Sequence, residues 1–138
     1  MSRIVTVFPS IQSRILVDCV VGIPDNVNPI HSSSSVICHA LIDTGAMISA
    51  ISNRIVSYMN LPVSGSQEII AANNHHDVVD SYIVNLGLNS EVYFPLVQVS
   101  CLDMDEYDII IGMDLLNQGD LIISNVDGRT VFIFEQHG

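Results

Sequence analysis

A single aspartate, Asp43, stands where a run of apolar residues meets a turn of small ones. Segment 36–42 is largely apolar and β-branched, and Thr44 and Gly45 follow the aspartate directly. A carboxylate at the end of a buried strand is costly unless it is paired or used in chemistry. The small residues after Asp43 let backbone N–H groups approach its oxygens. The pattern predicts a carboxylate that takes part in a reaction. The triplet alone fits an ordinary turn at a strand end equally well.

One reaction that such a carboxylate performs without a metal is amide hydrolysis opposite a second carboxylate. Two acids about 3 Å apart cannot both ionise, so one of them keeps its proton. The ionised acid takes a proton from water, and the protonated acid polarises the carbonyl of the scissile bond. The chain contains one Asp-Thr-Gly triplet, so the second aspartate would have to come from a second copy. The expectation is a homodimer that acts on a peptide or protein substrate without cofactor or metal.

A second apolar segment supports this expectation. Residues 109–111 are three isoleucines, and Gly112 separates them from a short helix predicted over 113–118. Asp114 in the first turn of that helix complements the helix dipole. Gly119 is expected to end the helix.

The rest of the chain is predicted to be mainly β-structure. Loose two-residue periodicity, typical of strands covered on both faces, predicts strands over 14–23, 36–42, 67–72, 77–86, 91–100, 121–124 and 129–134. A helix is predicted after Ser52, which is suited to cap it. Segment 67–86 is expected to form a hairpin with a polar tip, and Asp127 with Gly128 predicts a tight turn in a last hairpin. Residues 1–138 are expected to form one all-β domain with one or two short helices.

The composition argues against several function classes. The net charge is −11 with no lysine, so the surface repels the phosphates of nucleic acid and anionic membranes. No apolar run approaches the roughly 20 residues of a membrane-spanning helix, and the start of the chain is too short and strand-like for a signal peptide. Cys19, Cys38 and Cys101 are widely spaced, which predicts free thiols rather than a disulfide framework or a zinc site. Apolar residues make up 49% of the chain, enough to leave surface for a partner subunit. We expect a cytoplasmic protein that binds neither nucleic acid nor membranes.

Segments 41–46 and 109–116 together resemble the retropepsin family of aspartic proteases. The likeness is closer to the stand-alone retroviral-type proteases of bacterial and other cellular genomes, and it runs from about residue 14 to residue 134. It implies a single-lobe acid-protease fold, a closed β-barrel that is half of a two-fold dimer.

The resemblance also implies a role for each matching residue. Asp43 would be the catalytic aspartate, Thr44 would hydrogen-bond its copy across the dimer axis, and Gly45 would offer backbone groups to the carboxylates. Hairpin 67–86 would be a flap that closes over bound peptide. The residues expected to contact substrate are Ala46, Ala72, Asn73, Asn74 and Ile111. Segment 110–112 would support the active-site loop from below, and the ends near 1–8 and 129–134 could interleave in a dimer sheet.

The flap tip departs from the family pattern. Retropepsin flaps are often rich in glycine there, whereas residues 72–76 read Ala-Asn-Asn-His-His; asparagine tolerates left-handed backbone, so a turn is feasible. This departure leaves open a second function, a retropepsin-fold dimerisation or peptide-binding module without catalysis. His75 and His76 are expected to be solvated, because adjacent histidines point apart and no third ligand is suitably spaced. The acidic segment 103–108 lacks the glycine of a calcium loop and is predicted to be a solvated turn.

Overall fold

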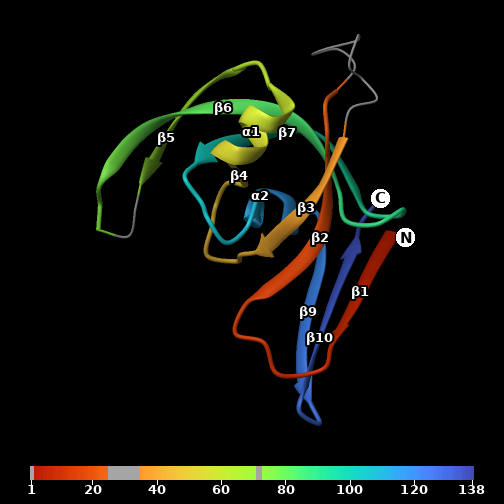
Figure 1. The fold of residues 1–138 in the computed structure, drawn as a ribbon. Coiled ribbons are helices and arrows are strands. Elements are labelled where there is room, and N and C mark those ends of the chain that lie inside the picture. Colours follow the sequence, from red (N-terminus) through yellow and green to blue (C-terminus); the bar gives the residue numbers. More distant parts are fainter. Residues whose placement is uncertain (1, 25–34, 71–72) are drawn as a thin grey trace.

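The computed structural model describes residues 2–24, 35–70 and 73–138, and these form ten strands and two short helices (Figure 1). The strands are β1 (Ser2–Phe8), β2 (Ile15–Gly22), β3 (Ser35–Ile42), β4 (Ala50–Ser52), β5 (Gly65–Ile70), β6 (His76–Gly87), β7 (Tyr93–Leu102), β8 (Ile109–Ile111), β9 (Gly119–Val126) and β10 (Arg129–Gln136). The helices are α1 (Asn53–Met59) and α2 (Met113–Leu116). Within these residues, neither helix has the length and apolar character needed to cross a membrane.

Six of the strands close into a ring. In the order β2-β3-β8-β4-β7-β6 each strand is hydrogen-bonded to the next, and β6 pairs again with β2. The register of this closing pair places Val21 opposite Leu86, and both side chains are completely buried. β5 continues the sheet outward from β6. The predicted closed, mainly β barrel is therefore confirmed.

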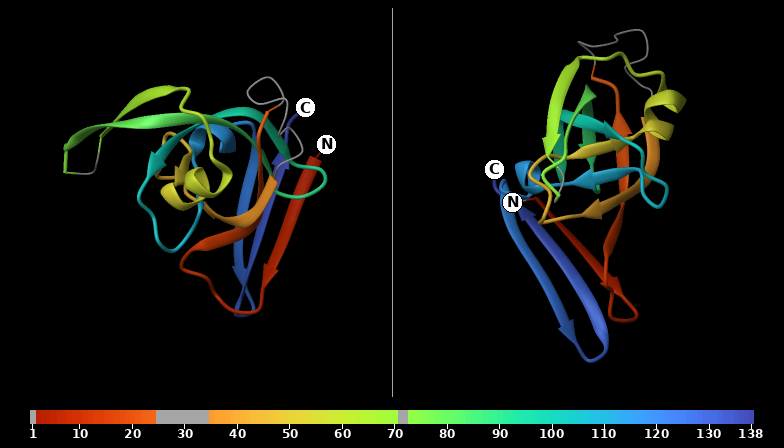
Figure 2. Two further views of the ribbon diagram at one scale, coloured as in Figure 1. Left: turned by 45° about the horizontal axis from the view of Figure 1, so that its top comes forward. Right: turned by 90° about the vertical axis from the view of Figure 1, so that its left-hand side faces the viewer.

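The two ends of the chain pair with each other in a separate three-stranded sheet. β10 lies between β1 and β9, and the β9–β10 hairpin extends away from the barrel (Figure 2). Phe132 and Phe134 of β10 are completely buried, and the ring of Phe134 lies 6.1 Å from that of Phe94 on β7, centroid to centroid. Burial of these rings on the barrel side attaches the terminal sheet to the same apolar core.

Local sequence signals determine several ends of these elements, as predicted. The Ser52 hydroxyl accepts a hydrogen bond from the Ile55 N–H at 3.4 Å and caps α1, which ends at Asn60 with a φ of 53°. Asp127 and Gly128 have φ values of 58° and 73°, the conformation of a tight two-residue hairpin turn. These positions follow from chain-local chemistry alone.

Near the helices, one local prediction was wrong and one strand was missed. α2 stops at Leu116, and Gly119 is instead the first residue of β9. A Cβ at position 119 would collide with the Glu135 carbonyl of the adjacent strand, so this glycine permits close approach of two strands. β4 was not predicted, because three residues are too few to show a periodicity. All three residues of β4 are buried between β7 and β8.

Candidate active site

Asp43 lies at the end of β3, next to β8. Parallel pairing places Ile42 beside Ile111, and the Asp43 N–H donates to the Ile111 carbonyl at 3.0 Å. The Gly45 N–H donates to the Asp43 carboxylate at 2.9 Å. A Cβ on Gly45 would come within 3.2 Å of the same oxygen, so a larger residue would push the carboxylate away. The backbone thus holds a partly exposed carboxylate on a short turn.

Thr44 is exposed beside this carboxylate. Among the described residues, its side-chain hydroxyl forms no hydrogen bond. Its position leaves the hydroxyl available to a group outside this chain.

Ser49 and Asp114 connect the loop after Asp43 to α2. The Ser49 hydroxyl and N–H donate to the two Asp114 oxygens at 2.8 and 3.0 Å, and the hydroxyl accepts the Gly112 N–H at 3.0 Å. The Met113 N–H also donates to the Ala46 carbonyl at 2.8 Å. Asp114, in the first turn of α2, also accepts the Leu115 N–H at 3.0 Å, and its contacts with Ser49 fix the loop that follows Asp43.

An apolar cavity of about 270 Å³ opens beside this loop. Met47 and Ile48 of the loop and Ile110 of β8 contribute to its wall, together with Ala46. Ile111, which was expected to contact substrate, is completely buried in the core. Successive strand residues point to opposite sides, so Ile110 takes the position on the cavity wall.

The β5–β6 hairpin covers the other side of the cavity, where residues 68–70 of β5 line it. Ser100, another lining residue, donates through its hydroxyl to the Gln67 side-chain carbonyl at 2.6 Å. Gln67 therefore points toward the barrel, and Ile69 shares its face because strand side chains alternate. Glu68 belongs to the opposite face, where its carboxylate lies 3.2 Å from His76 Nδ1.

The tip of the hairpin contains most of the remaining predicted contact residues. Ala72 lies outside the described residues. Asn74 has a φ of 63°, the left-handed conformation that asparagine tolerates. The Asn73 side-chain oxygen accepts the His75 N–H at 3.0 Å, so the tip is a turn built on asparagine chemistry instead of glycine.

His75 and His76 are exposed, as predicted, and each lies beside a different acidic side chain. His75 lies 3.3 Å from Asp77, whereas His76 pairs with Glu68. Within the described part of the chain, no three histidine, cysteine or acidic side chains converge as a metal site would require.

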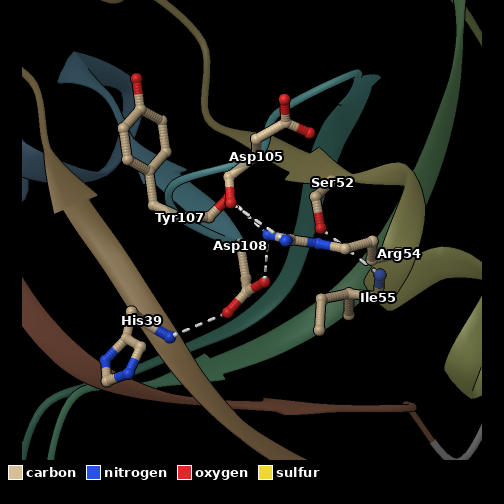
Figure 3. Close-up of polar contacts among 7 residues, drawn as sticks. All are labelled: His39, Ser52, Arg54, Ile55, Asp105, Tyr107 and Asp108. Carbon is tan, nitrogen blue, oxygen red and sulfur yellow. Dashed lines mark hydrogen bonds and ion pairs between the residues drawn. The ribbon is translucent and has the colours of Figure 1, made fainter.

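The acidic turn 103–108 is more firmly held than the sequence suggested (Figure 3). The Arg54 guanidinium donates to Asp108 Oδ1 and to the Asp105 carbonyl, both at 3.0 Å. The His39 N–H donates to the other Asp108 oxygen at 3.2 Å, and the Asp108 side chain is only 18% exposed. The prediction of a solvated turn was wrong for Asp108, which links α1 to β3, the strand that precedes Asp43.

Sequence reasoning missed Ser49 as part of the site, and it gave Ile110 a supporting role beneath the loop and no contact with substrate. Ser49 lies 65 positions from Asp114, and no local pattern relates the two. Ile110 could have been chosen over Ile111 from the alternation of a strand, once the buried face was known.

Comparison with known proteins agrees with this geometry. A family model described as "gag-polyprotein putative aspartyl protease" matches residues 34–118, which contain the Asp43 turn, the hairpin and Gly112. No protein of curated function matches the sequence.

Solved structures that are similar to this chain include two that are described as retropepsin-like or retroviral protease-like. A retropepsin-like aspartic protease from Rickettsia conorii superposes with a TM-score of 0.59 at 12% identity, over 96% of this chain and 92% of the other. The retroviral protease-like domain of Ddi1 from Leishmania major has a TM-score of 0.48 at 18% identity, over 88% and 95% of the two chains. The first likeness shows the fold.

Proposed function

Because the chain belongs to the family of gag-polyprotein aspartyl proteases, we propose that it is an aspartic endopeptidase active as a homodimer. The observation that carries the proposal is the placement of Asp43 at a strand end. One of its oxygens is held by the Gly45 N–H, and the loop that follows lines an apolar cavity. The carboxylate in the wall of this cavity is that of Glu68, which lies 3.2 Å from His76 Nδ1.

In the proposed mechanism, the Asp43 carboxyls of two subunits share one proton. Two facing carboxyls cannot both be charged at contact distance, so the pair keeps one proton. The ionised Asp43 removes a proton from a water molecule as that water attacks the peptide carbonyl. The protonated Asp43 donates to the carbonyl oxygen, and proton transfer to the leaving nitrogen completes hydrolysis. Thr44 would bond its copy across the two-fold axis, and Gly45 would hold the carboxylate in place.

The terminal sheet offers surface for the second subunit. Val5, Ile133 and Ile122 form one row across its three strands, and Val5 and Ile122 are about half exposed, at 49% and 51%. β1 and β10 already pair within one chain, so partner strands would add to the face or the β1 and β9 edges of this sheet. Covering exposed apolar side chains would favour association.

The proposed substrate is an extended peptide with an apolar side chain next to the scissile bond. The apolar wall that Met47, Ile48 and Ile110 contribute to the cavity favours such a side chain. The β5–β6 hairpin would close over the peptide, with Asn73 and Asn74 at its tip. We place the activity in the cytoplasm, since Cys19, Cys38 and Cys101 are free thiols.

The test is cleavage of a diverse peptide library by the native protein and by Asp43→Asn. We expect the native protein to cut with a bell-shaped pH–rate profile, and Asp43→Asn to dimerise in sedimentation but cut nothing. Asp18→Asn is a matched control, because Asp18 is exposed and, among the residues that the structure describes, its carboxylate lies near His39 alone, at 3.4 Å; it should keep full activity. Cleavage by Asp43→Asn would refute the aspartic mechanism. A native dimer that cuts no peptide would support the non-catalytic binding module instead.

A further inference from the structure

A second cavity of about 350 Å³ adjoins the first, with Ile48 in the wall of both. It lies between the start of β7 and α2. Phe94, Val97 and Leu115, all buried, contribute to its apolar part. The flap strand β5 also joins the two cavities, because Ile69 lines the first and Gln67 the second.

The second cavity contains a carboxylate and glutamine amide groups, which can accept hydrogen bonds from a ligand. Asp114 is the charged side chain in its wall; its carboxylate accepts from Ser49 and the Leu115 N–H, and no basic side chain of the described residues pairs with it. The side-chain N–H groups of Gln98 and Gln118 donate to Ser81 Oγ at 3.3 Å and to the Asp114 carbonyl at 3.5 Å. Their side-chain oxygens receive no hydrogen bond from the part of the chain that is described. A ligand here would therefore meet a carboxylate and two amide oxygens above an apolar floor.

From this arrangement we infer that the second cavity binds a lysine or arginine side chain of the peptide substrate. The aliphatic stem of a basic side chain packs on Phe94 and Leu115, and its charged end donates to the acceptors around Asp114. The net charge of −11 also attracts basic peptides over longer distances. This inference rests on the proposed function, because the second cavity can bind a side chain of the peptide only if the first cavity holds the same peptide as substrate.

The residues of β5 that line the two cavities indicate the position of the basic residue. In an extended peptide, side chains on one face recur every second residue. Gln67 and Ile69 of β5 have the same two-residue separation. The basic side chain is therefore two positions away, on the side farther from the scissile bond, from the apolar side chain in the first cavity.

The experiment compares cleavage of one library-derived peptide carrying Lys, Gln or Glu at that position. An exposed ion pair with the substrate raises kcat/KM by up to about fivefold. A change from Lys to Glu in the peptide replaces attraction by repulsion, so kcat/KM should fall about tenfold. High salt should reduce this ratio, because it screens both effects. Gln118→Lys places a cation in the cavity and should bring the Lys-to-Glu ratio to one or below. Gln12→Lys, with the same charge change outside both cavities, should keep the native ratio.

Failures of the two proposals are distinguishable. Cleavage of all three peptides with kcat/KM values within twofold would overturn the basic-residue inference and leave the peptidase intact. If no peptide is cut, the peptidase proposal fails, and binding of the Lys and Glu peptides to the native protein then tests the cavity directly. Equal affinities in that measurement would overturn the inference. Gln98→Lys repeats the test on a second wall residue should Gln118→Lys not fold.

Discussion

Ser49→Ala should destabilise the protein far more than the loss of one oxygen atom suggests. Ser49 is completely buried, and its hydroxyl joins the Gly112 N–H to the Asp114 carboxylate. Without the hydroxyl, the buried Gly112 N–H has no acceptor, at a cost of about 2 kcal/mol. The lost bond to Asp114 adds about 1 kcal/mol, a reduced value because Asp114 is exposed enough for water to replace it. The expected loss in the free energy of unfolding is about 3 kcal/mol.

Urea denaturation followed by circular dichroism measures this loss. With a denaturant dependence of about 2 kcal/mol per molar urea, the midpoint should fall by about 1.5 M while the slope stays the same. All samples need one protein concentration, because dimerisation would stabilise the folded chain by mass action. Ser57→Ala is the matched control, since Ser57 is exposed on α1; its effect should stay within about 0.5 kcal/mol.

The Asp114→Asn variant separates the hydrogen bonds from the charge. An asparagine keeps one acceptor oxygen for Ser49 and should cost about half as much as Ser49→Ala, or about 1.5 kcal/mol. In a double-mutant cycle the two changes should be strongly non-additive, because they remove the same contact. A Ser49→Ala midpoint no lower than that of Ser57→Ala would refute the view that this network holds the active-site loop.

Three further variants test other parts of the argument. Gly112→Ala should cost about 3 kcal/mol, because its Cβ would lie 2.7 Å from the Ala46 carbonyl oxygen; thermal unfolding that matches the native protein would contradict this close approach. Arg54→Met should lower the free energy of unfolding, measured by urea denaturation, by only about 1 kcal/mol, since the guanidinium beside Asp108 is about half exposed. A loss above about 3 kcal/mol would contradict the view that this ion pair is a weak, solvated contact. A hydrogen bond to Cys38 and burial raise the pKa of the Cys19 thiol well above its usual range, so the folded chain keeps a proton that the unfolded chain loses above about pH 8.5. The free energy of unfolding should therefore fall by about 1.4 kcal/mol per pH unit above that point, and Cys19→Ala should remove this part of the slope.

The local chemistry of the chain determined much of the fold in advance. Ser52 predicted the start of α1, and Asp127 with Gly128 predicted the last hairpin, because caps and tight turns depend on neighbouring residues. The closed barrel followed from resemblance carried by two short motifs, and not from periodicity. β4 and the true role of Gly119 were beyond prediction, since both depend on strands distant in the sequence.

The residues of the candidate site also fall into two groups, those that the sequence predicted and those that only the tertiary structure shows. Asp43, Thr44 and Gly45 could be chosen from the sequence, because a carboxylate on a turn of small residues has a local physical signature. The bond from Ser49 to Asp114, the exchange of Ile111 for Ile110 on the cavity wall, and the second cavity exist only once α2 and β5 lie beside the loop that follows Asp43. Hydrogen bonds between distant segments and the shape of a cavity depend on how elements are placed in space, and no pattern of neighbouring residues encodes that placement.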